Sequence, residues 1–412
     1  MSTTLKIILA LITGLCFGCL ANYFGFQSFV SNWISPVGEL FIRALQLVSI
    51  PLVIVSLVSG LASLEDSSKV SELGGRTLIA YLLTTVLAVF IGLLVVNVIQ
   101  PGNWITEQTR LDLLTQYAVD QEVSLATTAP SLHFILDLIP KNYFAALTDN
   151  RNMLQVILVS FFTGIAILKI TPSLRIQMTT IFKALNEIVM KMIGYIMWLA
   201  PLAVFALMAD VMINVPNKDL LAALIIYTLT VLLGLGILLF LVYPFAVKYF
   251  NGIKYNTFLK GIFPAQLIAI STSSSVATLP VTMECVEKNF NVRKEVSSFV
   301  LPIAATVSMD ATALYQAVAA LFISQVFGID LSVGAQLMVV VTATLASIGA
   351  AAVPSAGIIM LTIVLEQQGI PLEGLALILA LDRPLDMLRT ATNVTGDAAV
   401  ATVIDKNSKQ CE

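Results

Sequence analysis

Charge is scarce in this sequence of 412 residues. Only 11% of the residues are charged and 58% are hydrophobic, whereas soluble domains carry about 25% charged residues. The apolar stretches are long and unbroken instead of alternating, which favours helices over a barrel. The sequence therefore predicts an all-α polytopic membrane protein.

Residue types that bind metals or perform catalysis are also few. The single histidine, His133, has no evident second ligand, and the four cysteines form no metal-ligand pattern. There is no Ser-His-Asp set, Walker loop or HExxH motif, and the serine run at 271–275 lacks a nearby base. These absences, together with the lack of a large basic patch, argue against an enzyme and against a nucleic-acid partner.

Six apolar segments fill the first 250 residues. The N-terminal one is interpreted as a retained first span, because no clean cleavage site follows it. A polar segment at 100–130 is too hydrophilic to cross a membrane. The predicted spans are 5–25, 36–63, 75–99, a broken segment at 131–172, 179–213 and 219–248.

Small polar residues interrupt the apolar segments after Tyr255. The runs STSSSVATLP and ASIGAAAVPSAG lie in the middle of such segments, where irregular backbone is tolerated only if it is buried or lines a cavity. We therefore expect two re-entrant hairpins, at about 257–288 and about 333–368, with tips near 273–275 and 350–355. Paired interruptions of this kind indicate a binding site at the membrane midplane. The alternative is a set of ordinary kinked helices with small-residue packing faces.

Basic residues gather on one side of this topology. Lys6, Lys69, Arg76 and later clusters through Lys409 share a side, which by the positive-inside rule places both termini in the cytoplasm. The two hairpins then enter from opposite sides, in inverted symmetry.

A polar stripe stands out near the C-terminus. Read as a helix, its five side chains fall within an arc of roughly 80°, and they are Asp382, Asp386, Arg389, Asn393 and Asp397. Ionisable groups inside spans are costly and usually functional. A purely structural ion-pair network is the alternative.

The stripe offers two kinds of chemistry. The Arg389 guanidinium matches a carboxylate, which could come from Asp386, from Asp382 or from a substrate. Asp386 could balance Arg389 or receive a substrate ammonium group. Asp310 and Asp397, with nearby hydroxyls and hairpin carbonyls, form an oxygen-rich set suited to a small cation such as Na⁺.

Four motifs in order, STSSSVATLP, SMDATALYQAVAALF, ASIGAAAVPSAG and DMLRTATNVTGD, together with YLLTT at 81–85, resemble the glutamate/aspartate transporter family. The resemblance covers essentially the whole chain. It implies eight transmembrane helices plus two re-entrant hairpins, inverted repeats and an elevator mechanism in a homotrimer. A scaffold would comprise residues 1–73 and 101–215, and a transport domain residues 74–100 and 216–412.

The resemblance also assigns roles to residues. Arg389 would clamp the side-chain carboxylate of the substrate and Asp386 would receive its amino group. The substrate-binding residues implied are Ser274, Ser275, Met309, Thr312, Val353, Gly357, Asp386, Arg389, Thr390 and Asn393. The cation-binding residues implied are Tyr81, Thr84, Thr85, Ala304, Thr306, Ser308, Asp310, Ser347, Ile348, Ala350, Asn393 and Asp397.

The sequence departs from the family pattern at several positions. Ser308 replaces an asparagine that supports the sodium sites, and Ala311 replaces a glycine. Val276 interrupts the serine run of animal members, and Ser273 stands where some archaeal members have arginine. Gln316 replaces the glutamate linked to proton transport in animal carriers, so that proton route is expected to be absent.

Taken together, the resemblance implies a Na⁺-coupled symporter for aspartate or glutamate, accompanied by an uncoupled anion conductance. Arg389 and Asp386 suit a substrate that carries both charges, because a neutral substrate would leave the buried arginine unpaired. The alternatives are coupling to H⁺ or K⁺, a C4-dicarboxylate or neutral amino-acid carrier, and a channel or receptor. The short termini point to a bacterial inner membrane.

Overall fold

The computed structural model describes residues 3–62, 68–116, 139–148, 152–214, 218–348 and 356–409. Within these ranges the chain is helical and contains no strand, which confirms the predicted all-α class. The elements are α1 (Thr3–Tyr23), α2 (Gln27–Phe29), η1 (Val30–Ile34), α3 (Ser35–Ala62), α4 (Ser68–Ile99), η2 (Pro101–Trp104), α5 (Glu107–Gln116), α7 (Tyr143–Ala146), α8 (Met153–Lys169), α9 (Pro172–Asn214), α10 (Lys218–Gly236), η4 (Ile237–Val242), α11 (Tyr243–Asn251), α12 (Tyr255–Thr272), α13 (Ser275–Phe290), α14 (Lys294–Val307), α15 (Asp310–Val326), α16 (Val333–Ile348), α17 (Ala356–Gln367), η5 (Leu372–Gly374) and α18 (Leu375–Lys409).

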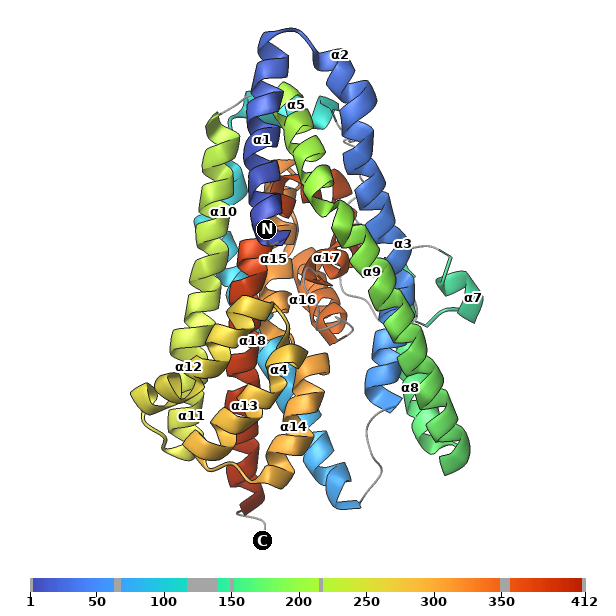
Figure 1. The fold of residues 1–412 in the computed structure, drawn as a ribbon, viewed down its shortest axis with the longest axis vertical. Helices are drawn as coiled ribbons and strands as arrows, with labels where there is room; N and C mark the ends of the chain where they lie inside the picture. The colour runs from blue at the N-terminus through green and yellow to red at the C-terminus, as the bar shows by residue number, and fades with distance from the viewer. Residues whose placement is uncertain are drawn as a thin grey trace.

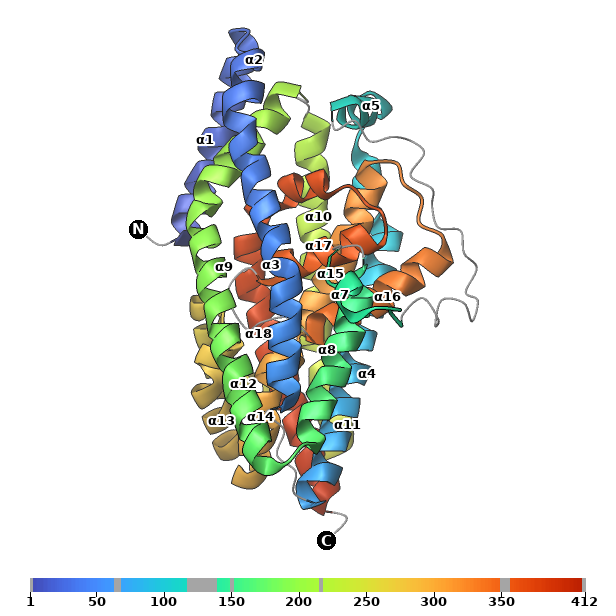
Figure 2. The same cartoon turned by 90° about the vertical axis from the view of Figure 1, so that its right-hand side faces the viewer.

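Helices α1, α3, α8 and α9 pack chiefly against one another. Figure 2 shows α1, α3 and α9 running side by side along one side of the molecule. Glycines allow the closest approach: a Cβ on Gly14 or Gly18 of α1 would lie 2.6 Å from a backbone carbonyl oxygen of α9. Small residues at such positions let helix backbones come together inside a membrane.

The other long helices surround α15 and α18. Helix α15 packs against α4, α10, α16, α17 and α18, and its side chains are buried along nearly its whole length. Helices α12, α13 and α14 pack along the C-terminal half of α18, toward the chain's C-terminus in Figure 1. Most of the buried polar and charged side chains lie in this second group of helices.

The first predicted hairpin is present. Helices α12 and α13 are antiparallel neighbours joined at Ser273 and Ser274, within the expected tip. Ser273 adopts a left-handed backbone with φ of 50°, and the Ser274 hydroxyl caps α13 by accepting the backbone N–H of Ala277 at 3.3 Å. A serine is a favoured N-cap because its oxygen satisfies a free amide of the first turn.

The second predicted hairpin is represented by its two arms, α16 and α17, which pack against each other. Its expected tip at 350–355, including Ala350 and Val353, lies outside the described residues.

A break also divides the segment after the first hairpin. Helix α14 ends at Val307 and α15 begins at Asp310, and neither Ser308 nor Met309 between them is helical. The amide of Ser308 still donates to the carbonyl of Ala304. The break brings the end of one helix and the start of the next to the same place, with the aspartate in the first turn of α15, where the helix dipole favours a negative charge.

Three stretches of the described chain are long and apolar enough to cross a membrane, namely Gly75–Trp104, Asp219–Asn251 and Lys294–Val326. The bent pair Pro172–Ile196 and Trp198–Asp210 would make a fourth. The qualifying parts of α1 and α3 are shorter, at Ile12–Tyr23 and Ile50–Ser59, than the roughly 20 residues that span a bilayer. The protein is thus a multi-pass helical membrane protein, and the expected number of eight spans stays a prediction.

Candidate functional site

Arg389 is the largest fully buried side chain, with 1% of its surface exposed. Its Nη2 donates to Asp382 Oδ1 and to Asp386 Oδ1, both at 2.8 Å. The guanidinium carbon lies 3.9 Å from the centre of the Tyr315 ring, a cation–π contact from α15. One helix and one aromatic ring thus hold the guanidinium. The predicted stripe is real, and its intrahelical ion pairs are part of the structure.

The same guanidinium has donors left over. Arg389 Nε and Nη1 are buried, and neither finds a hydrogen-bond partner among the described residues; the same is true of Asp382 Oδ2. An arginine remains charged when buried, and a buried donor without an acceptor is costly. The site can therefore accept carboxylate oxygens at Nε or Nη1, with Asp386 beside Nη2.

Residues of two other helices, α17 and α15, and Asn393 of α18 itself surround this fork. Gly357 of α17 is so close that a Cβ on it would lie 3.1 Å from Arg389 Nη2 and 3.3 Å from Thr312 Cγ2. Asn393 accepts the backbone N–H of Ala311 at 2.8 Å and donates to Thr312 Oγ1 at 3.4 Å. The predicted residues Gly357, Thr312, Asn393 and Arg389 are thus brought together.

For the other predicted substrate residues the structure gives a position but no defined contact with the Arg389 guanidinium. Met309 is buried at the break between α14 and α15. Thr390 is buried beside Arg389, but its hydroxyl donates to the Asp386 carbonyl within the helix. Ser274 and Ser275 stand at the start of α13, a helix that packs on α18.

Asp310 is the centre of a second buried polar cluster. Its Oδ1 accepts from the Thr85 hydroxyl at 2.6 Å and from the Ser308 hydroxyl at 3.5 Å, and its Oδ2 accepts from the Tyr243 hydroxyl at 3.0 Å. These groups come from α4, the helix break and α11. The cluster presents several oxygens in one buried place, as a small hard cation requires.

The two other predicted α4 members of this cluster, Tyr81 and Thr84, also have backbone carbonyls as neighbours. The Tyr81 hydroxyl lies 3.5 Å from the Val300 carbonyl, and the Thr84 hydroxyl donates to the Tyr81 carbonyl at 3.1 Å. The Thr85 hydroxyl makes the short hydrogen bond to Asp310 and lies 2.8 Å from the Tyr81 carbonyl, and the Thr84 side chain is also within hydrogen-bonding range of Asp310.

The other predicted cation ligands lie at helix ends. Ala304 and Thr306 belong to the last turn of α14, and Ser347 and Ile348 end α16. The last carbonyls of a helix lack intrahelical partners and form its negative pole. Asp397 is buried in α18, and its Oδ1 has no partner among the described residues. The described chain contains no cluster of three or more His, Cys, Asp or Glu that could hold a metal ion.

Sequence reasoning missed Tyr243 and Tyr315. Both are buried tyrosines in apolar helices; the Tyr243 hydroxyl donates to Asp310, whereas Tyr315 contacts Arg389 through its ring. A tyrosine in an apolar helix marks a polar position but does not identify Asp310 or Arg389 as what it contacts.

Comparison with known proteins agrees with this arrangement. Residues 3–407 match the sequence profile of the sodium:dicarboxylate symporter family. Excitatory amino acid transporter 1 of Ambystoma tigrinum is 33% identical over 98% of this chain and 82% of the relative. Excitatory amino acid transporter 3 of Homo sapiens is 33% identical over 100% of this chain and 85% of the relative. An excitatory amino acid transporter of Caenorhabditis elegans is 35% identical over 92% of this chain and 82% of the relative. The predicted family is confirmed, and the chain belongs to the sodium:dicarboxylate symporter family.

Proposed function

We propose that this protein is a secondary active symporter that carries aspartate or glutamate across the membrane together with Na⁺. The observation that carries the proposal is the buried Arg389, whose Nε and Nη1 are unpaired among the described residues while Asp386 lies against Nη2. An acidic amino acid offers a carboxylate to the unpaired donors of Arg389 and an ammonium group to the Asp386 carboxylate.

The surrounding residues support substrate roles. Gly357 and Thr312 leave little room beside the guanidinium, and Asn393 is held by the Ala311 amide so that its side chain is oriented. Ser274, Ser275, Met309 and Thr390 would complete the substrate site from the first hairpin, the helix break and α18. Val353 would do so from the second hairpin.

Na⁺ coupling is proposed for the buried oxygens. Asp310 with Thr85 would hold one ion, and Asp397 with the Asn393 and Ala304 carbonyls another. The carbonyls at the ends of α14 and α16 would supply a third. The Ser308 hydroxyl reaches Asp310 only at 3.5 Å, so the cation geometry there differs from that of members with asparagine, and H⁺ coupling is the alternative.

The helix packing supports an elevator arrangement. Helices α1, α3, α8 and α9 would form the scaffold of a homotrimer. Helices α4, α10 to α16, α17 and α18 would move as the transport domain, with the second hairpin as the extracellular gate. Both termini would lie in the cytoplasm and the protein in the plasma membrane, with an anion conductance accompanying transport.

Uptake by purified protein in liposomes tests the proposal. We expect labelled aspartate to accumulate when an inward Na⁺ gradient is imposed, and H⁺ or K⁺ gradients applied separately reveal the alternative couplings. Aspartate uptake that ignores every cation gradient would falsify the symporter.

Variants of the stripe test substrate recognition. Arg389→Ala should abolish aspartate binding, and Asp386→Ala should weaken aspartate binding more than succinate binding. Loss of the guanidinium leaves the buried Asp382 carboxylate without its ion-pair partner, which costs roughly 3–5 kcal/mol, whereas Asp386 keeps its ion pair with Arg383 at 3.5 Å. The double variant Asp382→Asn with Arg389→Ala therefore provides a better-folded comparison. Arg43→Ala, on an exposed side chain of α3, is the control. Unchanged aspartate affinity in the double variant contradicts the clamp role.

A further inference from the structure

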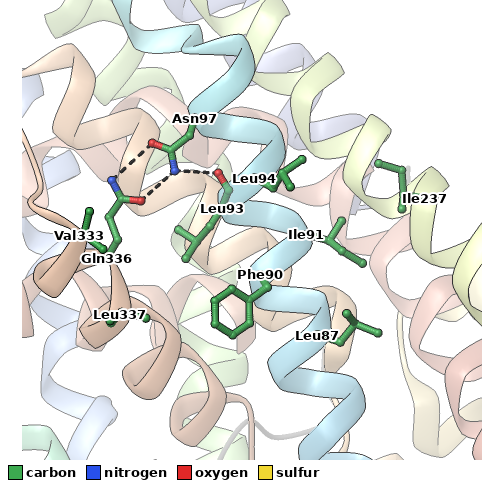
Figure 3. A pocket seen from close by; sticks show the side chains of 10 residues that line it. All are labelled: Leu87, Phe90, Ile91, Leu93, Leu94, Asn97, Ile237, Val333, Gln336 and Leu337. Atoms are coloured by element: carbon green, nitrogen blue, oxygen red, sulfur yellow. Dashed lines mark hydrogen bonds between the residues drawn. The ribbon is translucent and has the colours of Figure 1, made fainter.

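A groove of about 540 Å³ lies on the outer face of the second group of helices, between α4, η4 and α16. Figure 3 shows Phe90 and Leu93 of α4 on the side toward Leu337 of α16, and Leu87 and Leu94 on the side toward Ile237 of η4. Its volume falls in the range of about 300–1,000 Å³ that is typical of small-molecule sites. It is separate from the Arg389 and Asp310 clusters, whose side chains do not line it.

The chemistry of the lining is almost wholly apolar. Eight of the ten lining side chains are aliphatic or aromatic, two are amides, and none carries a charge. A ligand that depends on a charged group would find no counter-charge here.

The two amides close one edge of the groove and bind each other. Asn97 Nδ2 donates to Gln336 Oε1 at 2.8 Å and to the Leu93 carbonyl at 2.8 Å. Gln336 Nε2 donates to Asn97 Oδ1 at 3.4 Å and to the Leu331 carbonyl at 3.2 Å. All four amide hydrogens are therefore engaged, and the pair has no donor to offer to a phosphate or carboxylate.

The surroundings of the groove are those of a bilayer. Two of its three walls belong to the spanning stretches Gly75–Trp104 and Asp219–Asn251. Large apolar side chains point outward at its rim, among them Leu94, which is 65% exposed. At bilayer depth there is no water to fill an open apolar groove, so hydrocarbon is what reaches it.

The wall formed by η4 carries a local irregularity. The residues Ile237–Val242 between α10 and α11 form a π-helix, and Ile237, its first residue, lines the groove. Such bulges are rare and often occur at functional sites.

We propose that this groove binds one acyl chain of a membrane phospholipid, held in order along the face of α4 that lies between η4 and α16 and selected by its shape and not by its headgroup. The inference goes beyond the proposed transport function and does not depend on it. The bound chain packs against the first arm of the second hairpin, so the bilayer touches that hairpin directly.

Photocrosslinking of the full-length protein tests this site. The protein is reconstituted into phosphatidylcholine liposomes with a trace of phosphatidylcholine that bears a diazirine in the middle of one acyl chain, and labelled peptides are mapped by mass spectrometry. We expect labelling of the stretches 87–97 and 333–337 to exceed that of other lipid-facing helix surfaces several-fold. Labelling spread evenly over the apolar faces overturns the proposal.

A matched pair of variants on one helix provides the control. Leu94→Trp fills the groove and should remove most of this labelling, whereas Leu83→Trp should not, although Leu83 is on α4 and 64% exposed against 65% for Leu94. Leu337→Trp fills the groove from the opposite wall and keeps the test decisive if the first variant folds poorly. Equal loss of labelling in Leu83→Trp, or labelling that changes when phosphatidylglycerol replaces phosphatidylcholine as the probe, also overturns it.

Discussion

At the scale of single residues, the two polar clusters solve the same physical problem in different ways. Arg389 is a permanent charge, so two carboxylates and a tyrosine ring compensate its burial. Asp310 faces no basic side chain in a described ion pair, and hydroxyls from Thr85 and Tyr243 donate to it instead. Hydroxyls can turn toward or away from an arriving cation, which makes the second cluster the better cation site.

Tyr243→Phe tests the role of the tyrosine hydroxyl at the residue scale. It removes one buried donor to Asp310 while keeping the ring, and a hydrogen bond to a charged group contributes about 1.5–3 kcal/mol. We expect the Na⁺ concentration for half-maximal aspartate uptake to change by about tenfold or more. Tyr249→Phe is the matched control, because Tyr249 lies on the same helix and is 84% exposed. Identical Na⁺ dependence in both variants contradicts a cation role for this cluster.

At the scale of helices, close approach between elements is decided by glycine. Gly357 lets α17 lie directly on the Arg389 side chain of α18, and Gly18 lets α1 lie on the α9 backbone. The two contacts differ in what a side chain would press upon. A side chain at Gly357 would meet the Arg389 side chain inside the candidate substrate site. A side chain at Gly18 would meet the α9 backbone, where α1 and α9 pack together.

Gly357→Ala should therefore impair recognition. The added methyl would lie 3.1 Å from Arg389 Nη2, and overpacking of this kind typically costs 1–3 kcal/mol, so we expect aspartate affinity to fall by about tenfold. Gly334→Ala on the other arm of the same hairpin is the control, since its Cβ would meet only the Ser332 hydroxyl at 3.7 Å. Calorimetric binding measurements decide the matter, and equal affinities in the two variants argue against this placement of α17.

Gly18→Ala should instead lower stability and leave affinity unchanged. Its Cβ would lie 2.6 Å from the Ala209 carbonyl oxygen, so α1 and α9 must separate, at a cost of about 1–3 kcal/mol. Gly194→Ala meets nothing within 4 Å and should raise stability slightly, because alanine favours a helix by about 1 kcal/mol over glycine. Melting temperatures of the purified variants check the sign of each change. An unchanged melting temperature for Gly18→Ala contradicts the close contact between α1 and α9.

At the scale of the whole molecule, the two groups of helices differ in polarity. The first group is joined mainly by apolar contacts and glycine-mediated packing, whereas the second contains Arg389, Asp310, Asp397 and the broken segments around them. A moving body that carries charge through a membrane has to enclose the polar groups that bind it. This distribution supports the division into scaffold and transport domain.

Hydrogen exchange with and without aspartate and Na⁺ tests that division. We expect ligand to slow exchange in α4, in both hairpins and in α15 and α18, and to leave α1, α3 and α9 unchanged, because binding stabilises only the elements it touches. Peptides from the N-terminal helix α1 serve as the internal reference. Protection that rises equally in α3 and α9 contradicts two separately responding bodies.

The sequence by itself determined the helical class, the first hairpin, the two arms of the second and the family. These features rest on local patterns: apolar length predicts helices, and a helical period of 3.6 residues places Asp386, Arg389 and Asn393 on one face whatever surrounds them. Even the internal pairing of Arg389 with Asp386, three residues apart, was among the predicted partners.

Only the tertiary structure decided which distant groups complete each cluster. Thr85 lies 225 residues from Asp310 in the chain, and Tyr243 lies 67 residues from it. The position of Tyr315 under Arg389, the approach of Gly357 and the groove between α4 and α16 likewise depend on how helices pack. The physical reason is that periodicity encodes which face of a helix is buried, while the packing of side chains between helices selects the partner that each buried polar group meets.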